Sequence, residues 1–199
     1  DGGGPPDGVV PGDGEGGGAR PCGEEGGLDA ARLVEEELER RDLDVFGVAD
    51  IYDVGGGEPL FASFEREDWA LLNLRFELHL LVHAFRRDCA EPGRIGFPPE
   101  HLEFYYRLYY SKPLQIRKYG CANVRELLAL ARDTVTLHGK VLESMVPDDW
   151  VGNGVFVKLT EESRRERQER LDAGDESARL RFPARAGAPA PGVPRSSAA

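Results

Sequence analysis

Two histidines, His79 and His83, stand four residues apart in the most hydrophobic segment of the chain. In a helix this spacing places both imidazoles on one face, where they can share a zinc ion. Leu80 follows the first histidine, whereas a metalloprotease helix carries a glutamate there. The pair therefore has two interpretations: a metal site completed by Cys89 or Cys121, or two structural histidines near the core. We favour the second interpretation and predict no metal site.

The sequence contains no pattern that is typical of a catalytic site. It lacks the phosphate-binding GxxxxGK[ST] loop, the GxSxG nucleophile elbow and the HExxH zinc helix. The glycines at 55–57 follow a predicted strand, but Glu58 and Pro59 come next instead of a helix start, so this turn suits phosphate poorly. Asp50 and Asp53 are typical of a solvated turn. We therefore predict a non-enzymatic protein with no catalytic residues and no cofactor.

Cationic and aromatic side chains alternate between residues 105 and 140, and this combination can bind nucleic acid. Lysine and arginine bind phosphates, while aromatic rings stack on unpaired bases. The residues that we predict to bind nucleic acid, RNA above all, are Arg107, Lys112, Arg117, Lys118, Tyr119, Arg125, Arg132 and Lys140, with Tyr106 and Tyr110 as further rings.

The formal net charge of −11 is distributed unevenly along the chain. Residues 1–66 carry 5 arginines and 17 acidic side chains, a net charge of −12. Residues 67–147 carry 11 basic and 10 acidic side chains, and residues 148–199 carry 9 of each. Since the acidity belongs to the amino-terminal part, the central part can still present a basic surface.

The first element needed to position these side chains is a long helix over residues 67–87. Leucines and aromatic residues cover most of its circumference. Acidic residues at its start and Arg86 and Arg87 at its end suit the helix dipole. A helix that is apolar on so many sides is either the centre of a core or half of an intermolecular pair.

A second helix and a short extended segment are expected next. Pro98 and Pro99 favour the first turn of a helix over residues 100–111. Residues 114–119 alternate between apolar and polar side chains, which predicts an extended segment. Gly120 then predicts a turn with positive φ.

The third helix begins after Asn123, a favourable N-cap with Glu126 in the capping-box position. It is expected to reach Arg132, and its outer face carries two arginines. That face is either solvated or suited to a flat negative surface. Residues 134–137 and 140–145 predict two strands around a His138-Gly139 turn. The expected class is therefore α+β and mainly helical, a small winged helix-turn-helix with a short β-wing.

The flanking segments have a different composition. Residues 155–159 predict a short strand or a docking segment, and the strongly charged residues 161–173 predict a helix that is exposed or forms on a partner. The divisions that we predict are a disordered Gly/Pro/acidic tail at 1–27, an acidic helix and β-hairpin at 28–66, the winged-helix domain at 67–147, a loop, short strand and charged helix at 148–174, and a disordered tail at 175–199.

The segment FYYRLYYSKPLQIRKYGCANVRELLALARDTVTL resembles the OST-HTH, or LOTUS, domain. The likeness covers about residues 71–145 and rests on a tyrosine-rich helix end, a K-P-L extended piece, a lysine-aromatic-glycine step, a helix with paired leucines and an R-D-T-V lead into the wing. The resemblance implies a winged-helix fold. It also implies RNA binding, in some members of G-rich structured RNA, and in others docking to a DEAD-box helicase.

These observations predict a non-enzymatic nucleic-acid-binding module of an RNA-regulatory protein. The alternative is a protein interaction module built on the apolar helix 69–85, with a DEAD-box helicase or a second copy of the chain as partner. The three cysteines form no disulfide framework, which favours an intracellular location, cytoplasmic or nuclear. No apolar run is long enough to predict a membrane span. The chain begins at Asp1, so we expect a fragment of a longer protein.

Overall fold

The computed structural model describes residues 43–183 except 90, 92, 148–151 and 153. The predicted disorder of 1–27, the predicted helix at 28–41 and the tail after residue 183 lie outside the described residues. Residues 1–43 and 44–199 form separate units, and the elements below all belong to the second.

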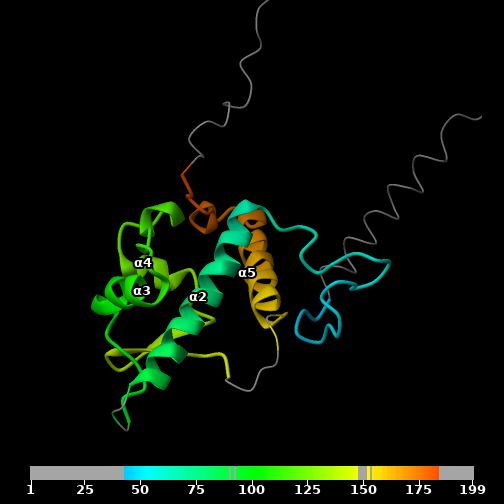
Figure 1. The fold of residues 1–199 in the computed structure, drawn as a ribbon. Helices are drawn as coiled ribbons and strands as arrows, with labels where there is room; N and C mark the ends of the chain where they lie inside the picture. The colour runs from blue at the N-terminus through cyan, green and yellow to red at the C-terminus, as the bar shows by residue number, and fades with distance from the viewer. Residues whose placement is uncertain (1–42, 90, 92, 148–151, 153, 184–199) are drawn as a thin grey trace, which may run out of the picture. The chain divides into compact units, whose positions relative to one another are not determined.

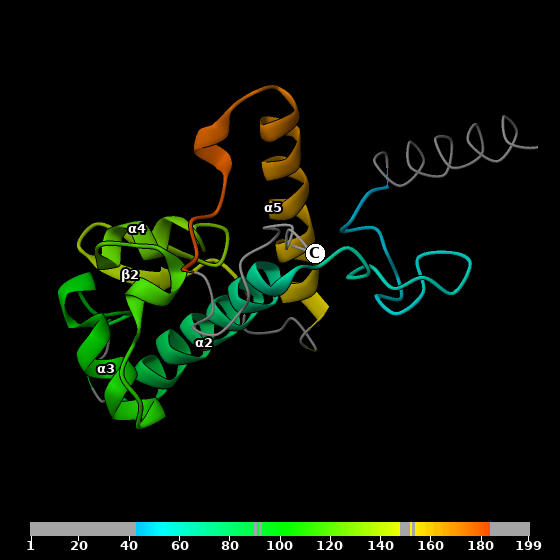
Figure 2. The ribbon, with the colours of Figure 1, turned by 90° about the horizontal axis from the view of Figure 1, so that it is seen from above.

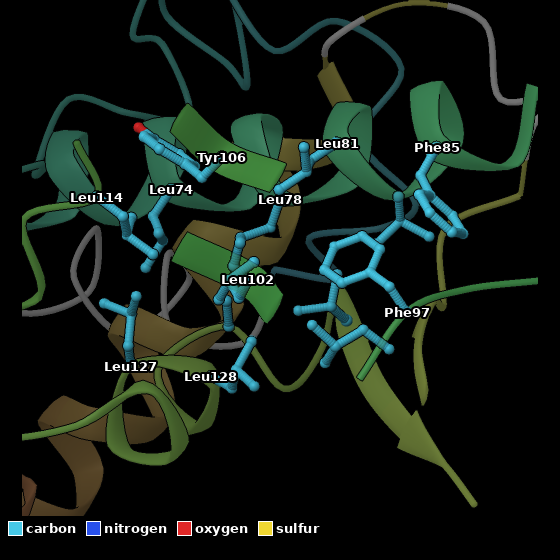
Figure 3. Close-up of a cluster of buried hydrophobic side chains, with 14 of the residues drawn as sticks. Leu74, Leu78, Leu81, Phe85, Phe97, Leu102, Tyr106, Leu114, Leu127 and Leu128 are labelled. Carbon is cyan, nitrogen blue, oxygen red and sulfur yellow. The ribbon is translucent and has the colours of Figure 1, made fainter. Parts of the chain in front are cut away.

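The long helix α2 spans Arg66–Asp88, as its hydrophobic pattern predicts. Its start is closed by a capping box, in which the backbone N–H of Glu65 donates to the Asp68 carboxylate at 2.9 Å. One apolar face of α2 enters the main core, where its leucines and Phe85 meet residues of the helices that follow (Figure 3).

The helices after α2 agree largely with expectation. A 3₁₀ turn, η1, at Pro99–His101 leads into α3 at Leu102–Tyr110. The helix α4 spans Val124–Ala129 and begins with the predicted cap, since the N–H of Glu126 donates to Asn123 Oδ1 at 3.0 Å. It ends earlier than Arg132 because 3₁₀-type bonds tighten the next turn.

The extended segment predicted for 114–119 is wrong from Ile116 onward. Residues Ile116–Tyr119 form a 3₁₀ helix, η2, held by a bond from the N–H of Lys118 to the carbonyl of Gln115 at 3.0 Å. Residues three apart share a side of a 3₁₀ helix, so its first and last residues both pack against the core. Gly120 then takes a φ of 73°, as predicted.

The β-wing is present as a two-stranded antiparallel sheet. Strand β1, Val135–His138, pairs with β2, Val141–Ser144, and His138 faces Val141 in the register. The two-residue turn is therefore Gly139-Lys140 and not His138-Gly139, because Gly139 supplies the positive φ, 63°, that such turns require. The α+β, mainly helical class with a short wing is confirmed.

The β-hairpin predicted around Gly55–Gly57 is wrong, because the structure assigns no strand to residues 43–64. The chain turns there through three glycines with positive φ, and Asp53 Oδ1 accepts bonds from the N–H groups of Gly55 and Gly57. Two backbone hydrogen bonds join the segments on either side of the turn: the N–H of Val54 donates to Glu58, and the N–H of Leu60 donates to Ile51. Two bonds do not make the regular ladder of a β-hairpin.

The strand predicted at 155–159 is also wrong, because these residues open helix α5, Gly154–Asp172. Val155 and Phe156 bury their side chains with Val146 against the second apolar side of α2, which Leu72 and Phe76 provide. Tertiary packing therefore overrides the β-propensity of the segment. It also accounts for the apolar circumference of α2, which lies between the main core and α5 (Figure 1).

The charged half of α5 is neither fully exposed nor dependent on a partner chain. Arg167 forms an ion pair at 2.5 Å with the buried Asp68 at the start of α2. Glu161 is buried as well and accepts bonds from Arg164 and Arg165 of its own helix. The charged side chains of α5 therefore help to hold this helix against α2.

Residues 175–183, here called the C-terminal strap, follow α5 and include a 3₁₀ turn, η3, at Glu176–Ala178. Leu180 and Phe182 pack against the main core, so the disorder predicted from residue 175 is wrong up to 183. Figure 2 shows the strap running from the end of α5 back toward α4 and β2. Among the described helices, none is long and apolar enough to cross a membrane.

Candidate nucleic-acid interface

The two histidines lie where α2 meets the wing and α5. Their rings are 4.1 Å apart between centroids, and His79 Nδ1 is 2.8 Å from Ser144 Oγ of β2. The ring of Phe156 from α5 packs on His79 at 5.2 Å. The part of the chain that the structure describes contains no group of three metal-ligating side chains. The contacts of His79 with Ser144 and Phe156 fit the structural interpretation of the pair, and the absence of a bound metal stays a prediction.

Glu77 of α2, which the sequence reasoning missed, organises the tyrosine-rich end of α3. Its carboxylate accepts a bond from the Tyr106 hydroxyl and one from Lys112 Nζ at 2.5 Å, and its backbone carbonyl accepts from the Tyr110 hydroxyl at 2.7 Å. The ammonium of Lys112 also lies 5.6 and 5.5 Å from the centroids of the two tyrosine rings.

This cluster removes the Tyr106 ring from the candidate surface and binds the hydroxyl of the half-buried Tyr110. Tyr106 is only 4% exposed, so its ring cannot stack on a base. Burial and the adjacent Glu77 carboxylate raise the pKa of the Tyr106 hydroxyl, and burial raises the pKa of Tyr110 to about 12. Lys112 stays accessible, but Glu77 balances its charge.

Arg132 is likewise paired and does not present a free charge next to Arg125. Its guanidinium binds Glu166 of α5 at 2.9 Å across an exposed ion pair. On the outer face of α4, Arg125 in the first turn is therefore exposed and unpaired among the described residues, whereas Arg132 beyond the last turn pairs with α5. No local signal in the sequence identifies Glu166, 34 residues further along, as the partner.

The other predicted cations are exposed and form no ion pair with any described residue. Arg117 and Lys118 lie on η2, and Arg125 lies in the first turn of α4, which η2 contacts. Arg107 lies on α3 and Lys140 in the wing turn, so they belong to other elements. The structure thus places three of the predicted cations on two contacting elements, η2 and α4.

Tyr119 closes η2 and is half-buried beneath the C-terminal strap. Its ring meets Phe182 edge-on, with centroids 5.6 Å apart, and burial raises the pKa of its hydroxyl to about 12. Next to it, the carbonyl oxygen of Arg181 lies 2.1 Å from where a Cβ on Gly120 would be. The strap backbone therefore passes directly over the η2 turn.

A groove of about 680 Å³ lies between the end of α4, α5 and the strap. Arg132, Arg167 and Arg170 line it, and each has a carboxylate partner, in the last case Asp175 at 2.7 Å. Because these charges are compensated, the groove offers no free cation for a phosphate.

No protein-family model, curated protein or solved structure matches the chain.

Proposed function

We propose that the protein binds RNA, without catalysis, through a surface formed by η2 and the start of α4. The observation that supports this most directly is that Arg117, Lys118 and Arg125 are exposed on two contacting elements without a compensating carboxylate among the described residues. Each cation can bind a phosphate and release a condensed counterion. Tyr119 lies on the same turn and is only half-buried, so it is the predicted ring that can contact a base there.

The presence or absence of a compensating carboxylate also ranks the remaining predicted cations. Lys112 and Arg132 contribute less, since Glu77 and Glu166 already balance their charges. Arg107 and Lys140 are uncompensated within the described residues but lie on α3 and the wing. They extend the surface if the RNA is long enough to reach them.

We further propose that residues 71–145 are an OST-HTH-like domain and that the protein regulates RNA in the cytoplasm or nucleus. The order of helices followed by a β-wing supports it. Docking to a DEAD-box helicase belongs to the same proposal, as a property that the resemblance implies.

The test is binding of the full chain to structured RNA, single-stranded RNA and duplex DNA across a salt series. We expect RNA binding to weaken steeply with salt, with a slope of about 0.7 in log K per phosphate contact on single strands. The triple variant Arg117→Glu, Lys118→Glu, Arg125→Glu should abolish most of the affinity. Unchanged affinity and slope in that variant would refute the proposal.

A matched control separates this surface from the effect of net charge. The triple variant Arg86→Glu, Arg87→Glu, Arg94→Glu changes the total charge by the same amount. It acts at the far end of α2 and in the loop that follows, where Arg87 and Arg94 pair with Asp88 and Glu91. We expect it to retain most of the RNA affinity.

A second candidate function, protein interaction, is favoured by a surface outside helix 69–85. The core and α5 cover most apolar side chains of that helix, although Trp69 and Leu80 stay exposed. Phe104 and Leu108 lie one turn apart on α3 and are 64% and 61% exposed. Such a pair suits self-association of α3 faces. Sedimentation of the chain and of the variant Phe104→Glu, Leu108→Glu tests this; a wild-type monomer at high concentration would exclude self-association.

A further inference from the structure

The C-terminal strap is held in place by specific polar contacts at its start. Gly174 has a φ of 87°, which turns the chain at the end of α5. Asp175 then accepts a bond from Ser177 N–H at 3.0 Å and pairs with Arg170 of α5 at 2.7 Å. The strap is therefore fixed at the helix end from which it leaves.

Beyond η3 the strap alternates between partly buried and exposed side chains. Leu180 and Phe182 pack inward on the core, whereas Arg179 and Arg181 point outward and are exposed. A period of two is that of an extended chain lying on an apolar surface. Both arginines thus belong to the outer side of the strap.

Only one of these two arginines is compensated. Arg179 binds both carboxylate oxygens of Glu176, at 2.8 and 3.2 Å. Arg181 forms no ion pair with any residue in the described ranges, and its backbone carbonyl lies against Gly120, one residue from Tyr119 and two from Lys118. Its position is set by the strap backbone and by the ring contact of Phe182 with Tyr119.

We propose that Arg181 binds a phosphate of the same RNA as Arg117 and Lys118, so that the strap completes the RNA-binding surface. This inference rests on the proposed function. The strap then has a role beyond packing, because its backbone places Arg181 next to the η2 turn. A side chain at position 120 would displace the strap backbone, so the close contact depends on glycine.

The experiment compares single variants of the full chain that change one charge each, with a labelled single-stranded RNA and a G-rich structured RNA as probes. We expect Arg181→Gln to weaken binding about fourfold at about 0.15 M salt and to lower the salt slope by about 0.7, the loss of one phosphate contact. Arg181→Lys should retain most of the affinity. Arg179→Gln, two residues away, is the matched control and should bind like the wild type.

Hydrogen exchange of the strap amides separates lost charge from a displaced strap, and we expect unchanged exchange in Arg181→Gln. If Arg181→Gln binds like the wild type while Arg117→Gln with Lys118→Gln binds weakly, the role of Arg181 is refuted and the proposed function stands. If the wild type binds neither RNA, both are refuted. If Arg179→Gln weakens binding as much as Arg181→Gln, the specific role of Arg181 is also refuted.

Discussion

The guanidinium of Arg75, fully buried on α2, binds both carboxylate oxygens of Asp133, 58 residues further along the chain, at distances from 2.7 to 3.1 Å. It also lies 3.4 Å from the hydroxyl of Thr160 on α5. A single side chain therefore joins the long helix, the connection into the wing and the last helix. This ion pair holds together the three parts that position the candidate surface.

Replacing Asp133 with asparagine should lower the free energy of unfolding by about 3 kcal/mol, because it leaves the Arg75 guanidinium buried without a counter-charge. Urea denaturation of the single variant measures this. The double variant Arg75→Met, Asp133→Asn should lose less, since no buried charge remains. A loss below about 1 kcal/mol in Asp133→Asn would show that solvent compensates Arg75.

Gly120→Ala should destabilise the protein more than Gly139→Ala. Both glycines have positive φ, 73° and 63°, where alanine costs roughly 1–2 kcal/mol. Only at Gly120 would the new Cβ meet a neighbour, the carbonyl oxygen of Arg181. Denaturation of both variants, with hydrogen exchange at Leu180 and Phe182, measures the difference. Equal stability and equal exchange would contradict the close contact of the strap.

Stability should fall in alkaline solution as the buried tyrosines ionise. Burial, followed by the Glu77 charge, raises the pKa of Tyr110 and Tyr119 from 10.0 to about 12. A raised pKa means that the folded state favours the neutral phenol. This contribution is complete below pH 10, the unfolded pKa, and is lost as the pH rises toward about 12. Urea midpoints across that range should fall less steeply in Tyr119→Phe than in the wild type.

The strap should loosen in acid through Asp175. The hydrogen bond from Ser177, together with Arg170, lowers the pKa of this carboxyl below its ordinary 3.8. A lowered pKa gives stability that is present above the unfolded value and is lost as the pH falls through the folded value. Asp175→Asn should therefore lower the protection of the strap amides against hydrogen exchange at neutral pH, as protonation of Asp175 should do in the wild type. Slow exchange in that variant would show that Leu180 and Phe182 suffice.

Local signals in the sequence predict several features correctly. Asn123 and Glu126 form the expected cap because its atoms belong to neighbouring residues, and Gly120 takes the expected positive φ because few other residues tolerate it. The helix over 67–87 is found from its composition and periodicity. None of these features needs a contact from a distant part of the chain.

The errors arise where distant residues decide the conformation or the charge. Residues 155–159 have β-propensity, yet they form a helix because α2 offers a second apolar side. Lys112 and Arg132 look like free cations in the sequence, yet Glu77 and Glu166 compensate them across 35 and 34 residues. The composition predicts that Arg181 belongs to a disordered tail, yet the strap places its backbone against Gly120.

The sequence by itself therefore determined the three central helices, the β-wing and the set of cations and tyrosines from which a nucleic-acid surface can form. Only the tertiary structure decided which of those charges remain uncompensated and which rings are buried. The physical reason is that helix caps, turns and amphipathic periods involve residues a few positions apart. Ion pairing and burial depend instead on which distant segments the folded core brings together.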